Sequence, residues 1–387
     1  MSTALLARDP DLSRLIDDGY VITVHAGHII VRIPYVTENR TVERGFLAHP
    51  ITVSGDRLVS GTDHRIWFGG STPCTEHGHP LPLATPESRV IAEGMQANFM
   101  LSSKPPDGYP DQYTKITAYT RIIADHARAL APSATPTPGA AWQEIDDDTP
   151  FAYRDTATSR AGITAINHRF RGQRIAIVGL GGSGSYILDQ VAKTEVDSIL
   201  LIDGDTFDNH NAFRAPGAPT LDTLRERPSK VTYFASLYAN MHRRVTGCAQ
   251  YLDEDNLDLL YGATFVFLTS DDAASKPPIM DWLEAHDVPF IDVGMGIEEI
   301  DGNLSGLLRV TTSLPGRRDT ARQRIPRPAP ERDAYASNIQ TADLNALNAV
   351  LAVIRWKRSL GIYADATDEA HATYSLITNE IANEDLP

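Results

Sequence analysis

The sequence predicts an α/β protein with a domain built on a mostly parallel sheet, preceded by a smaller α+β domain. Continuous apolar runs of strand length, "RIAIVGL", "SILLIDGD", "TFVFLTS" and "PFIDVGM", are separated by polar loops and helical stretches in the second half. Strands that are apolar throughout are typical of a parallel sheet with helices on both faces. Residues 20–70 differ, because β-branched and aromatic residues punctuated by Gly, Pro and Asn predict short strands and turns.

The remaining elements set the expected domain boundaries. "DQYTKITAYTRIIADHARAL" predicts a helix over 111–130, and the following "APSATPTPGAAWQEIDDDTP" has the Pro, Ala and Thr content of an extended linker. We therefore expect an N-terminal domain over 1–135, a linker over 136–150 and a second domain over 151–387. Apolar residues at helical spacing over 339–361 predict a late helix that stops at Gly361.

Composition excludes several classes of protein. The formal charge of −15 argues against general nucleic-acid binding, which requires clustered Lys and Arg to contact phosphates. No apolar run is long enough to span a membrane, and the N-terminus lacks the pattern of a secretory signal, so we expect a cytoplasmic protein. The two cysteines form no C-x-x-C pair, which argues against a disulfide framework and a cysteine-rich zinc site.

A glycine-rich loop follows the first apolar run of the second domain. Its glycines allow a tight turn and close approach to a phosphate, and the next helix offers free N–H groups and the positive end of its dipole. Asp203 ends the following strand and is placed to accept hydrogen bonds from ribose hydroxyls. A dehydrogenase and an ATP-using enzyme fit these features equally well. The loop residues are Gly179, Gly181, Gly182, Ser183 and Gly184.

Residues further along favour phosphoryl chemistry. Asp205, Asn211 and Arg214 follow Asp203 in the single stretch "DGDTFDNHNAFRAP", and "RPSKV" adds Lys230. Charge that builds on phosphate oxygens in a transition state must meet donors already in place. Asp271 follows a later strand, at the sheet edge where ligands of open α/β sheets bind, and a carboxylate beside phosphates is a natural Mg²⁺ ligand.

Residues 151–361 resemble the ThiF/HesA/MoeB and ubiquitin-activating-enzyme superfamily, which has a Rossmann-like adenylation domain. The matching motifs are G-x-G-G-x-G at 179–184, D-x-D-T at 203–206, N-x-x-R at 211–214, the lysine of "PSK" at 230 and an S/T-D-[ND] at 270–272. The resemblance implies that ATP and Mg²⁺ bind here and that the C-terminal carboxylate of a ubiquitin-like protein attacks the α-phosphate. An acyl adenylate and pyrophosphate result.

The resemblance also assigns roles to residues. The glycine loop would cradle the phosphates, Asp203 would hold the ribose, and Asp271 would hold Mg²⁺. Contacts to the phosphates would come from Asn211, Arg214 and Lys230. Family members add an arginine from upstream of the glycine loop, reaching across a dimer, and here Arg154 and Arg160 are both candidates. It further implies a homodimer, with the N-terminal domain recruiting the modifier or a conjugating enzyme, as in bacterial modification systems.

The cysteines depart from the family pattern. Thioester-forming members carry a nucleophilic cysteine beyond the metal-binding aspartate, and no cysteine follows Cys248 here. Either the adenylate passes directly to another acceptor, or Cys74, which has His64, His77 and His79 nearby in sequence, is the nucleophile. The alternatives for Cys74 are a semi-buried thiol in a turn and a Cys/His metal site. Paired zinc cysteines are absent, so we expect no zinc in the adenylation domain.

Several features keep two interpretations. The arginine-rich stretch 309–332 either steers an acidic modifier or is a solvated loop. Asp205 either contacts ATP or only forms a turn. Asp272 is interpreted as a helix N-cap in preference to a second metal ligand, and "DVGMGIEEIDGNLSG" as a strand that exits into a loop.

The leading hypothesis for function is ATP-dependent activation of a ubiquitin-like modifier. Its alternatives are adenylation of a small-molecule or tRNA-borne carboxylate, an NAD-dependent oxidoreductase, and a catalytically inactive scaffold. The acidic composition disfavours tRNA, and Arg214, Lys230 and Asp271 disfavour a dehydrogenase.

Overall fold

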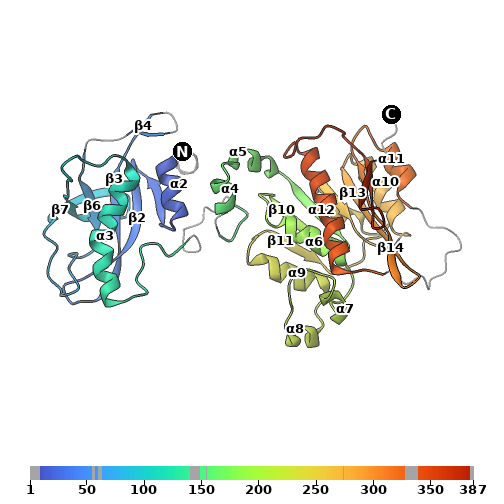
Figure 1. Ribbon diagram of the computed structural model, residues 1–387, viewed down its shortest axis with the longest axis horizontal. Helices are drawn as coiled ribbons and strands as arrows, with labels where there is room; N and C mark the ends of the chain where they lie inside the picture. Colours follow the sequence, from blue (N-terminus) through green and yellow to red (C-terminus); the bar gives the residue numbers. More distant parts are fainter. Residues whose placement is uncertain are drawn as a thin grey trace. The chain divides into compact units, whose positions relative to one another are not determined.

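A computed structural model describes residues 9–54, 57–59, 63–139, 149–153, 155–272, 274–326 and 339–383. The chain divides into two compact units (Figure 1), Met1–Asp146 with Tyr153–Thr164, and Asp147–Ala152 with Ala165–Pro387. Most of the expected linker, 140–148, lies outside the described residues. Of the helices in the described ranges, none combines the length and apolar character needed to cross a membrane.

The first unit is an antiparallel sheet packed against two helices, which confirms the expected α+β character. Its six strands lie in the order β1-β2-β3-β6-β8-β7, and every neighbouring pair is antiparallel. A separate short hairpin pairs β4 with β5. The strands are β1 (Ile22–His25), β2 (His28–Val36), β3 (Val42–Pro50), β4 (Thr52–Ser54), β5 (Arg57–Val59), β6 (Ile66–Gly69), β7 (Ala84–Ala92) and β8 (Met95–Leu101).

Helix α3 (Gln112–Leu130) confirms the helix expected over 111–130. It begins where the side chain of Asp111 accepts a hydrogen bond from the backbone of Thr114, which satisfies one of the free N–H groups of the first turn. Its apolar face and that of α2 (Pro10–Asp17) bury Leu12, Ile116 and Tyr119 in one core with residues of the sheet. This unit therefore has a hydrophobic core of its own.

The second unit contains an eight-stranded sheet in the order β11-β10-β9-β12-β13-β14-β15-β16. The strands from β11 to β13 run parallel, and β14, β15 and β16 continue the sheet in antiparallel pairs. The α/β prediction is confirmed, with an antiparallel extension. The strands are β9 (Arg174–Val178), β10 (Ser198–Ile202), β11 (Val245–Cys248), β12 (Phe265–Leu268), β13 (Phe290–Ile300), β14 (Asn303–Ser313), β15 (His371–Ser375) and β16 (Glu380–Asn383).

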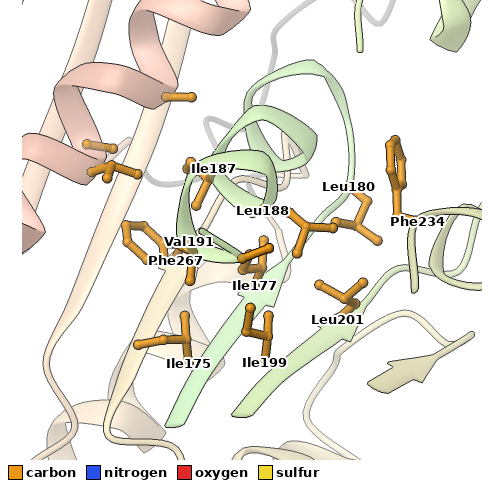
Figure 2. Close-up of a cluster of buried hydrophobic side chains, with 14 of the residues drawn as sticks. Ile175, Ile177, Leu180, Ile187, Leu188, Val191, Ile199, Leu201, Phe234 and Phe267 are labelled. Atoms are coloured by element: carbon orange, nitrogen blue, oxygen red, sulfur yellow. The ribbon is translucent and has the colours of Figure 1, made fainter. Parts of the chain in front are cut away.

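Helices cover both faces of the parallel strands, as the continuous apolar runs predict. Ile175 and Ile177 of β9 pack on one side against α6, and Figure 2 shows them below Ile187 and Leu188 of that helix. Ala176, on the opposite face of β9, belongs to a second core that includes residues of α10 and α11. The helices include α6 (Gly182–Val191), α7 (Asn209–Ala212), α8 (Leu221–Glu226), α9 (Lys230–Ala239), α10 (Lys276–Ala285), α11 (Asp319–Arg324) and α12 (Ala342–Ser359).

The stretch 292–306 differs from the expected strand-to-loop exit. Strand β13 continues to Ile300, turns through Asp301 and Gly302, both with positive φ, and returns as β14. Cross-strand pairing along the whole hairpin supplies the hydrogen bonds that hold Gly294 and Gly296 in extended conformation. The glycines therefore do not end the strand.

The structure describes residues 309–326 of the arginine-rich stretch. This part contains the end of β14, a turn and α11, and its arginines pair with carboxylates of this same chain. Residues 327–338, with Arg327 and Arg332, lie outside the described part. Four of the described arginines thus pair with acids of this chain, which weakens the solvated-loop interpretation for this part of the stretch. The pairs are Arg309–Asp292, Arg317–Asp368, Arg318–Asp287 and Arg322–Glu284.

Candidate nucleotide-binding site

A cavity of about 850 Å³ lies in the second unit where the parallel strands β9, β10, β12 and β13 end or pass. This is the edge at which open α/β sheets bind ligands. Nine predicted site residues line the cavity together, while Gly184 and Asn211 do not. The nine are Gly179, Gly181, Gly182, Ser183, Asp203, Asp205, Arg214, Lys230 and Asp271.

The glycines of the loop serve different purposes. Gly179 has φ +93°, and a Cβ there would lie 2.7 Å from the backbone N of Ser270. A Cβ on Gly184 would lie 2.1 Å from the backbone O of Gly179, so this glycine lets α6 pack closely on the loop. At Gly181, by contrast, a Cβ would meet nothing within 4 Å. Of these three glycines, only Gly181 faces open space, so only its lack of a side chain leaves room for a ligand in the cavity.

Helix α6 presents its N-terminus to the cavity. Gly181 is its N-cap and provides no side-chain hydrogen bond, so the first N–H groups of the helix receive no side-chain cap from that residue. Uncapped N–H groups and the helix dipole together favour an anion. The N-terminus also touches α12, because the hydroxyl of Ser183 donates to Oδ1 of Asn345 over 3.0 Å.

Asp203 fixes the loops on both sides of it. Its Oδ2 accepts a hydrogen bond from the backbone N of Leu180 at 2.5 Å, and its Oδ1 accepts one from the backbone N of Asp205 at 2.8 Å. The residue is 8% exposed. The carboxylate predicted to hold a ribose therefore also positions the glycine loop.

Lys230 is a buried cation between two acids. Its Nζ lies 2.6 Å from Oδ2 of Asp205 and 3.5 Å from Oδ2 of Asp203. Burial raises the pKa of Asp205, but hydrogen bonds from Lys230 and from the hydroxyl of Tyr251 outweigh it, so the net pKa lies below the usual value. Asp205 therefore does more than form a turn.

Asn211 and Arg214 leave donors without acceptors. Oδ1 of Asn211 accepts from the backbone N of Asp208 at 2.9 Å, which orients the amide. Nδ2 of Asn211 and Nε of Arg214 are buried and find no hydrogen-bond partner among the described residues. Buried donors without acceptors are costly, so an anion in the cavity beside Arg214 would satisfy a real deficit, whereas Asn211 does not line the cavity.

Asp271 lies exposed at the cavity edge, and Asp272 beside it forms a local turn. Oδ1 of Asp272 accepts from the backbone N of Ala274 at 2.9 Å, whereas the N-cap of α10 is Ser275. The N-cap interpretation of Asp272 is therefore wrong by three residues. The described part of the chain holds no cluster of three His, Cys, Asp or Glu side chains suited to a metal ion.

The sequence reasoning missed a second group of charges in the same cavity wall. Lys276, the first residue of α10, has its Nζ 2.5 Å from Oδ1 of Asp292, and Arg309 of β14 has its NH2 2.6 Å from Oδ2 of Asp292. Asp292 lies in the apolar run "PFIDVGM". A carboxylate inside a buried strand requires a cation, and that was the available signal.

Two further sets of lining residues were also missed. Gln250, Tyr251 and Leu252 follow β11, and the ring of Tyr251 lies so close to Gly204 that a Cβ there would come within 2.7 Å of it. Asn345 and Asn348, each 1% exposed, line the cavity from α12. Two asparagines three positions apart among the apolar residues in the first half of this helix were the signal for this second set.

Cys74 is a core residue of the first unit. It is 0% exposed and packs with Val36 and Ala127, and its thiol donates to the backbone O of Thr72 at 3.4 Å. Burial, followed by the charge of Glu38, raises the pKa of the thiol. An activated nucleophile needs the opposite shift, so the structure does not support that interpretation.

The nearby histidines have other neighbours. His77 faces Glu76 at 3.5 Å, and His64 bonds Ser102. Cys248 ends β11 and is only partly buried.

The structure does not describe the side chain of either upstream arginine. Arg154 lies outside the described residues, and the side chain of Arg160 is likewise not described. The backbone of Arg160 ends helix α4 (Thr156–Arg160), which belongs to the first unit. The choice between the two stays a prediction.

Comparisons with known proteins agree with the two-part organisation. Residues 10–156 match a domain of unknown function (DUF6791). A Bacillus subtilis (strain 168) tRNA threonylcarbamoyladenosine dehydratase is 24% identical over 150 residues, which cover 36% of this chain and 54% of that protein. The match thus spans about half the length of the relative.

Solved structures of low sequence identity align over much of the chain. E. coli MccB with ATP aligns with a TM-score of 0.49 at 15% identity, over 59% of this chain and 70% of that one. PaaA aligns with a TM-score of 0.48 at 17% identity, over 74% and 92%. Residues 156–381, more than half of the chain, match the ThiF family. The resemblance inferred from the motifs is confirmed, and the chain belongs to the ThiF family.

Proposed function

We propose that the second unit is an ATP-dependent adenylyltransferase that activates a carboxylate as its acyl adenylate. The observation that carries the proposal is the assembly of the α6 N-terminus, Arg214, Lys230 and Asp271 around one cavity. Membership of the ThiF family supports the same chemistry. If the site bound a nicotinamide cofactor instead of ATP, the cations Arg214 and Lys230 and the exposed carboxylate of Asp271 would have no role there.

The end of the cavity near the glycine loop suits a triphosphate. Its donors are the first N–H groups of α6, the guanidinium of Arg214 and the ammonium of Lys230. Nε of Arg214, which lacks an acceptor among the described residues, would gain one from a phosphate oxygen. Gly181 leaves room for the phosphates to approach the backbone.

The nucleoside would lie toward the loop after β11. Tyr251 and Leu252 offer an aromatic ring and an apolar side chain at the cavity wall, where a base can pack. Oδ1 of Asp203 accepts one backbone hydrogen bond and retains a second lone pair for a ribose hydroxyl. Asp203 would therefore bind ribose and hold the glycine loop at once.

Asp271 would hold Mg²⁺. A single carboxylate fits this role, because Mg²⁺ commonly takes one or two protein carboxylates and completes its shell with phosphates and water. When bound, the ion neutralises charge on the phosphates. The surrounding residues then need only position the reacting groups.

The reaction needs positioning and charge neutralisation. A carboxylate oxygen forms a bond to the α-phosphorus, the bond from that phosphorus to the bridging oxygen breaks, and pyrophosphate leaves with the electron pair. No catalytic base is required, because a carboxylate is already ionised at neutral pH. Arg214 and Lys230 would offset the repulsion between two anions and the charge that builds on the phosphates.

For the substrate, we propose the C-terminal carboxylate of a ubiquitin-like protein, with transfer to a conjugating enzyme or another acceptor and with the enzyme acting as a homodimer. The motif resemblance supports this choice. The second candidate is a small or tRNA-borne carboxylate, since the curated relative is a tRNA threonylcarbamoyladenosine dehydratase. The formal charge of −15 disfavours a tRNA surface.

The decisive experiment is exchange of labelled pyrophosphate into ATP, with and without ubiquitin-like proteins that end in glycine. We expect exchange that depends on the added protein, disappears in Asp271→Ala and persists in Asp222→Ala, which removes an exposed carboxylate of α8 that pairs with Arg225 away from the cavity. If no carboxylate supports exchange while a nicotinamide dinucleotide binds tightly, the proposal is wrong.

A further inference from the structure

The cavity contains a second cationic site, formed by Lys276 and Arg309. Both share one carboxylate, that of Asp292, at 2.5 and 2.6 Å. The side chains of Lys276 and Arg309 are 8% and 16% exposed, and that of Asp292 is 0% exposed. The cluster is therefore buried, yet Lys276 and Arg309 both belong to the cavity wall.

The charges of this cluster do not balance. Two cations share one carboxylate, which leaves an excess positive charge at a site mostly withdrawn from water. Burying a charge without a partner is costly, and an anion arriving from the cavity would remove that cost. Arg309 donates to Asp292 and, over 2.9 Å, to the hydroxyl of Thr311, so its five donors are not exhausted by these contacts.

Strand β13, which carries Asp292, leaves space for a ligand beside Lys276 and Arg309. Asp292, Gly294 and Gly296 share one face of β13, and Arg309 pairs with Gly294 across the hairpin. A Cβ on Gly294 would come within 2.5 Å of the Arg309 guanidinium, so the glycine lets Arg309 lie across the strand and reach Asp292. A Cβ on Gly296 would meet nothing within 4 Å, and this residue lines the cavity.

Asn348 adds an acceptor to the same cavity. Its Nδ2 donates to the backbone O of Gly294 at 2.9 Å, which fixes the orientation of the amide. Its Oδ1 is buried and finds no donor among the described residues. A peptide N–H near its terminal carboxylate would supply that donor, whereas a simple inorganic anion would not.

We propose that Lys276 and Arg309, oriented by Asp292, bind the terminal carboxylate of the substrate peptide, and that Oδ1 of Asn348 accepts its last peptide N–H. This inference rests on the proposed adenylation. It assigns the two ends of the cavity to the two reactants, the nucleotide at Arg214 and Lys230 and the peptide terminus at Lys276 and Arg309. Lys276 and Arg309 then hold the attacking group and leave the phosphates to the other cations.

The test uses N-acetyl-glycylglycine and its C-terminal amide as probes, titrated calorimetrically into the full chain saturated with a non-hydrolysable ATP analogue. We expect the acid to bind at least about tenfold more tightly than the amide. Lys276→Gln and Arg309→Gln should abolish that preference, while Arg309→Lys should restore part of it. Both Gln variants keep an N–H donor facing Asp292 and one cation beside it, so the buried carboxylate stays paired.

Controls separate this inference from the function on which it rests. Arg322→Gln, which alters an exposed arginine paired with Glu284, should leave the preference for the acid unchanged. The ATP analogue should bind the Lys276 and Arg309 variants as it binds the wild type. If the wild type does not bind the analogue, the proposed function fails, independently of the peptide result.

Two outcomes would overturn the peptide site itself. One is a wild type that binds the analogue but shows no preference for the acid. The other is a preference that survives in both Gln variants. An ester in place of the last peptide N–H should weaken binding to the wild type and have no further effect in Asn348→Ala.

Discussion

The ammonium of Lys230 lies 2.6 Å from a carboxylate oxygen of Asp205, so a cation of the proposed phosphate site is held by an acid of the same cavity. A pair of this kind fixes the position of a buried lysine side chain. Nucleotide binding would then require the lysine to share its donors between Asp205 and a phosphate.

Replacing Lys230 with Met should weaken ATP binding by about tenfold or more, because a charge-assisted hydrogen bond contributes about 1.5–3 kcal/mol. Isothermal titration with a non-hydrolysable ATP analogue measures the effect. Lys193→Met is the matched control, since Lys193 pairs with Asp189 on the exposed side of α6. Equal affinity in the Lys230 and Lys193 variants would remove Lys230 from the site.

Two glycines of the loop should respond oppositely to alanine. Gly181→Ala should change the free energy of unfolding by less than about 0.5 kcal/mol but lower ATP affinity, because its methyl group enters open cavity space. Gly179→Ala should destabilise the second unit by about 1–3 kcal/mol or more, because φ is +93° and Ser270 blocks the Cβ. Urea unfolding and nucleotide titration of both variants distinguish the two roles.

Cys74→Ala should leave acyl-adenylate formation unchanged, because the thiol is buried in the core of the first unit and its pKa is raised. Stability should fall by about 1 kcal/mol, as is usual for removing a small buried group. The measurement is pyrophosphate exchange together with a search for a thioester sensitive to reducing agents. A thioester that forms in the wild type and is lost in this variant would restore Cys74 as a nucleophile.

His242 should make the second unit sensitive to mild acid. Its Nε2 donates to the backbone O of Val196 at 3.0 Å, and its Nδ1 accepts from the backbone N of Arg244 at 3.3 Å, an arrangement that only the neutral ring can make. Burial lowers its pKa from the ordinary 6.5. Its stabilising contribution is therefore complete above pH 6.5 and is lost as the pH falls through the folded-state pKa.

The slope of stability against pH tests this histidine. Between pH 7.5 and 5, the wild type should lose up to about 1.4 kcal/mol per pH unit more than His242→Gln, which has no titrating ring. Urea unfolding at a series of pH values gives the difference. Parallel curves for the two proteins would show that the ring does not resist protonation.

Local patterns in the sequence predicted much of the fold. The helix ending at Leu130 and the parallel strands were predictable because capping residues and apolar runs are local signals. The extension of β13 to Ile300 was not predictable. Gly294 and Gly296 have poor intrinsic strand propensity, and the hydrogen bonds that keep them extended come from β14.

The candidate site was predictable to the same degree. The glycine loop and the acids after β10 each lie in one continuous stretch, so they can be recognised in the sequence alone. The cluster of Lys276, Asp292 and Arg309 was not displayed, because it depends on the cross-strand register that places Arg309 opposite Gly294. The position of Asp292 in an apolar run predicts that a cation lies beside its carboxylate, but it does not identify which residue provides that cation.

The hydrogen bond from Ser183 to Asn345 joins residues 162 positions apart in the chain. A Cβ on Gly182 would also collide with the Asn345 side chain, so α12 forms part of the support for the glycine loop. During synthesis the ribosome must therefore release α12 before this support can form. A nascent chain that has not yet released α12 therefore carries a glycine loop without one of its supports.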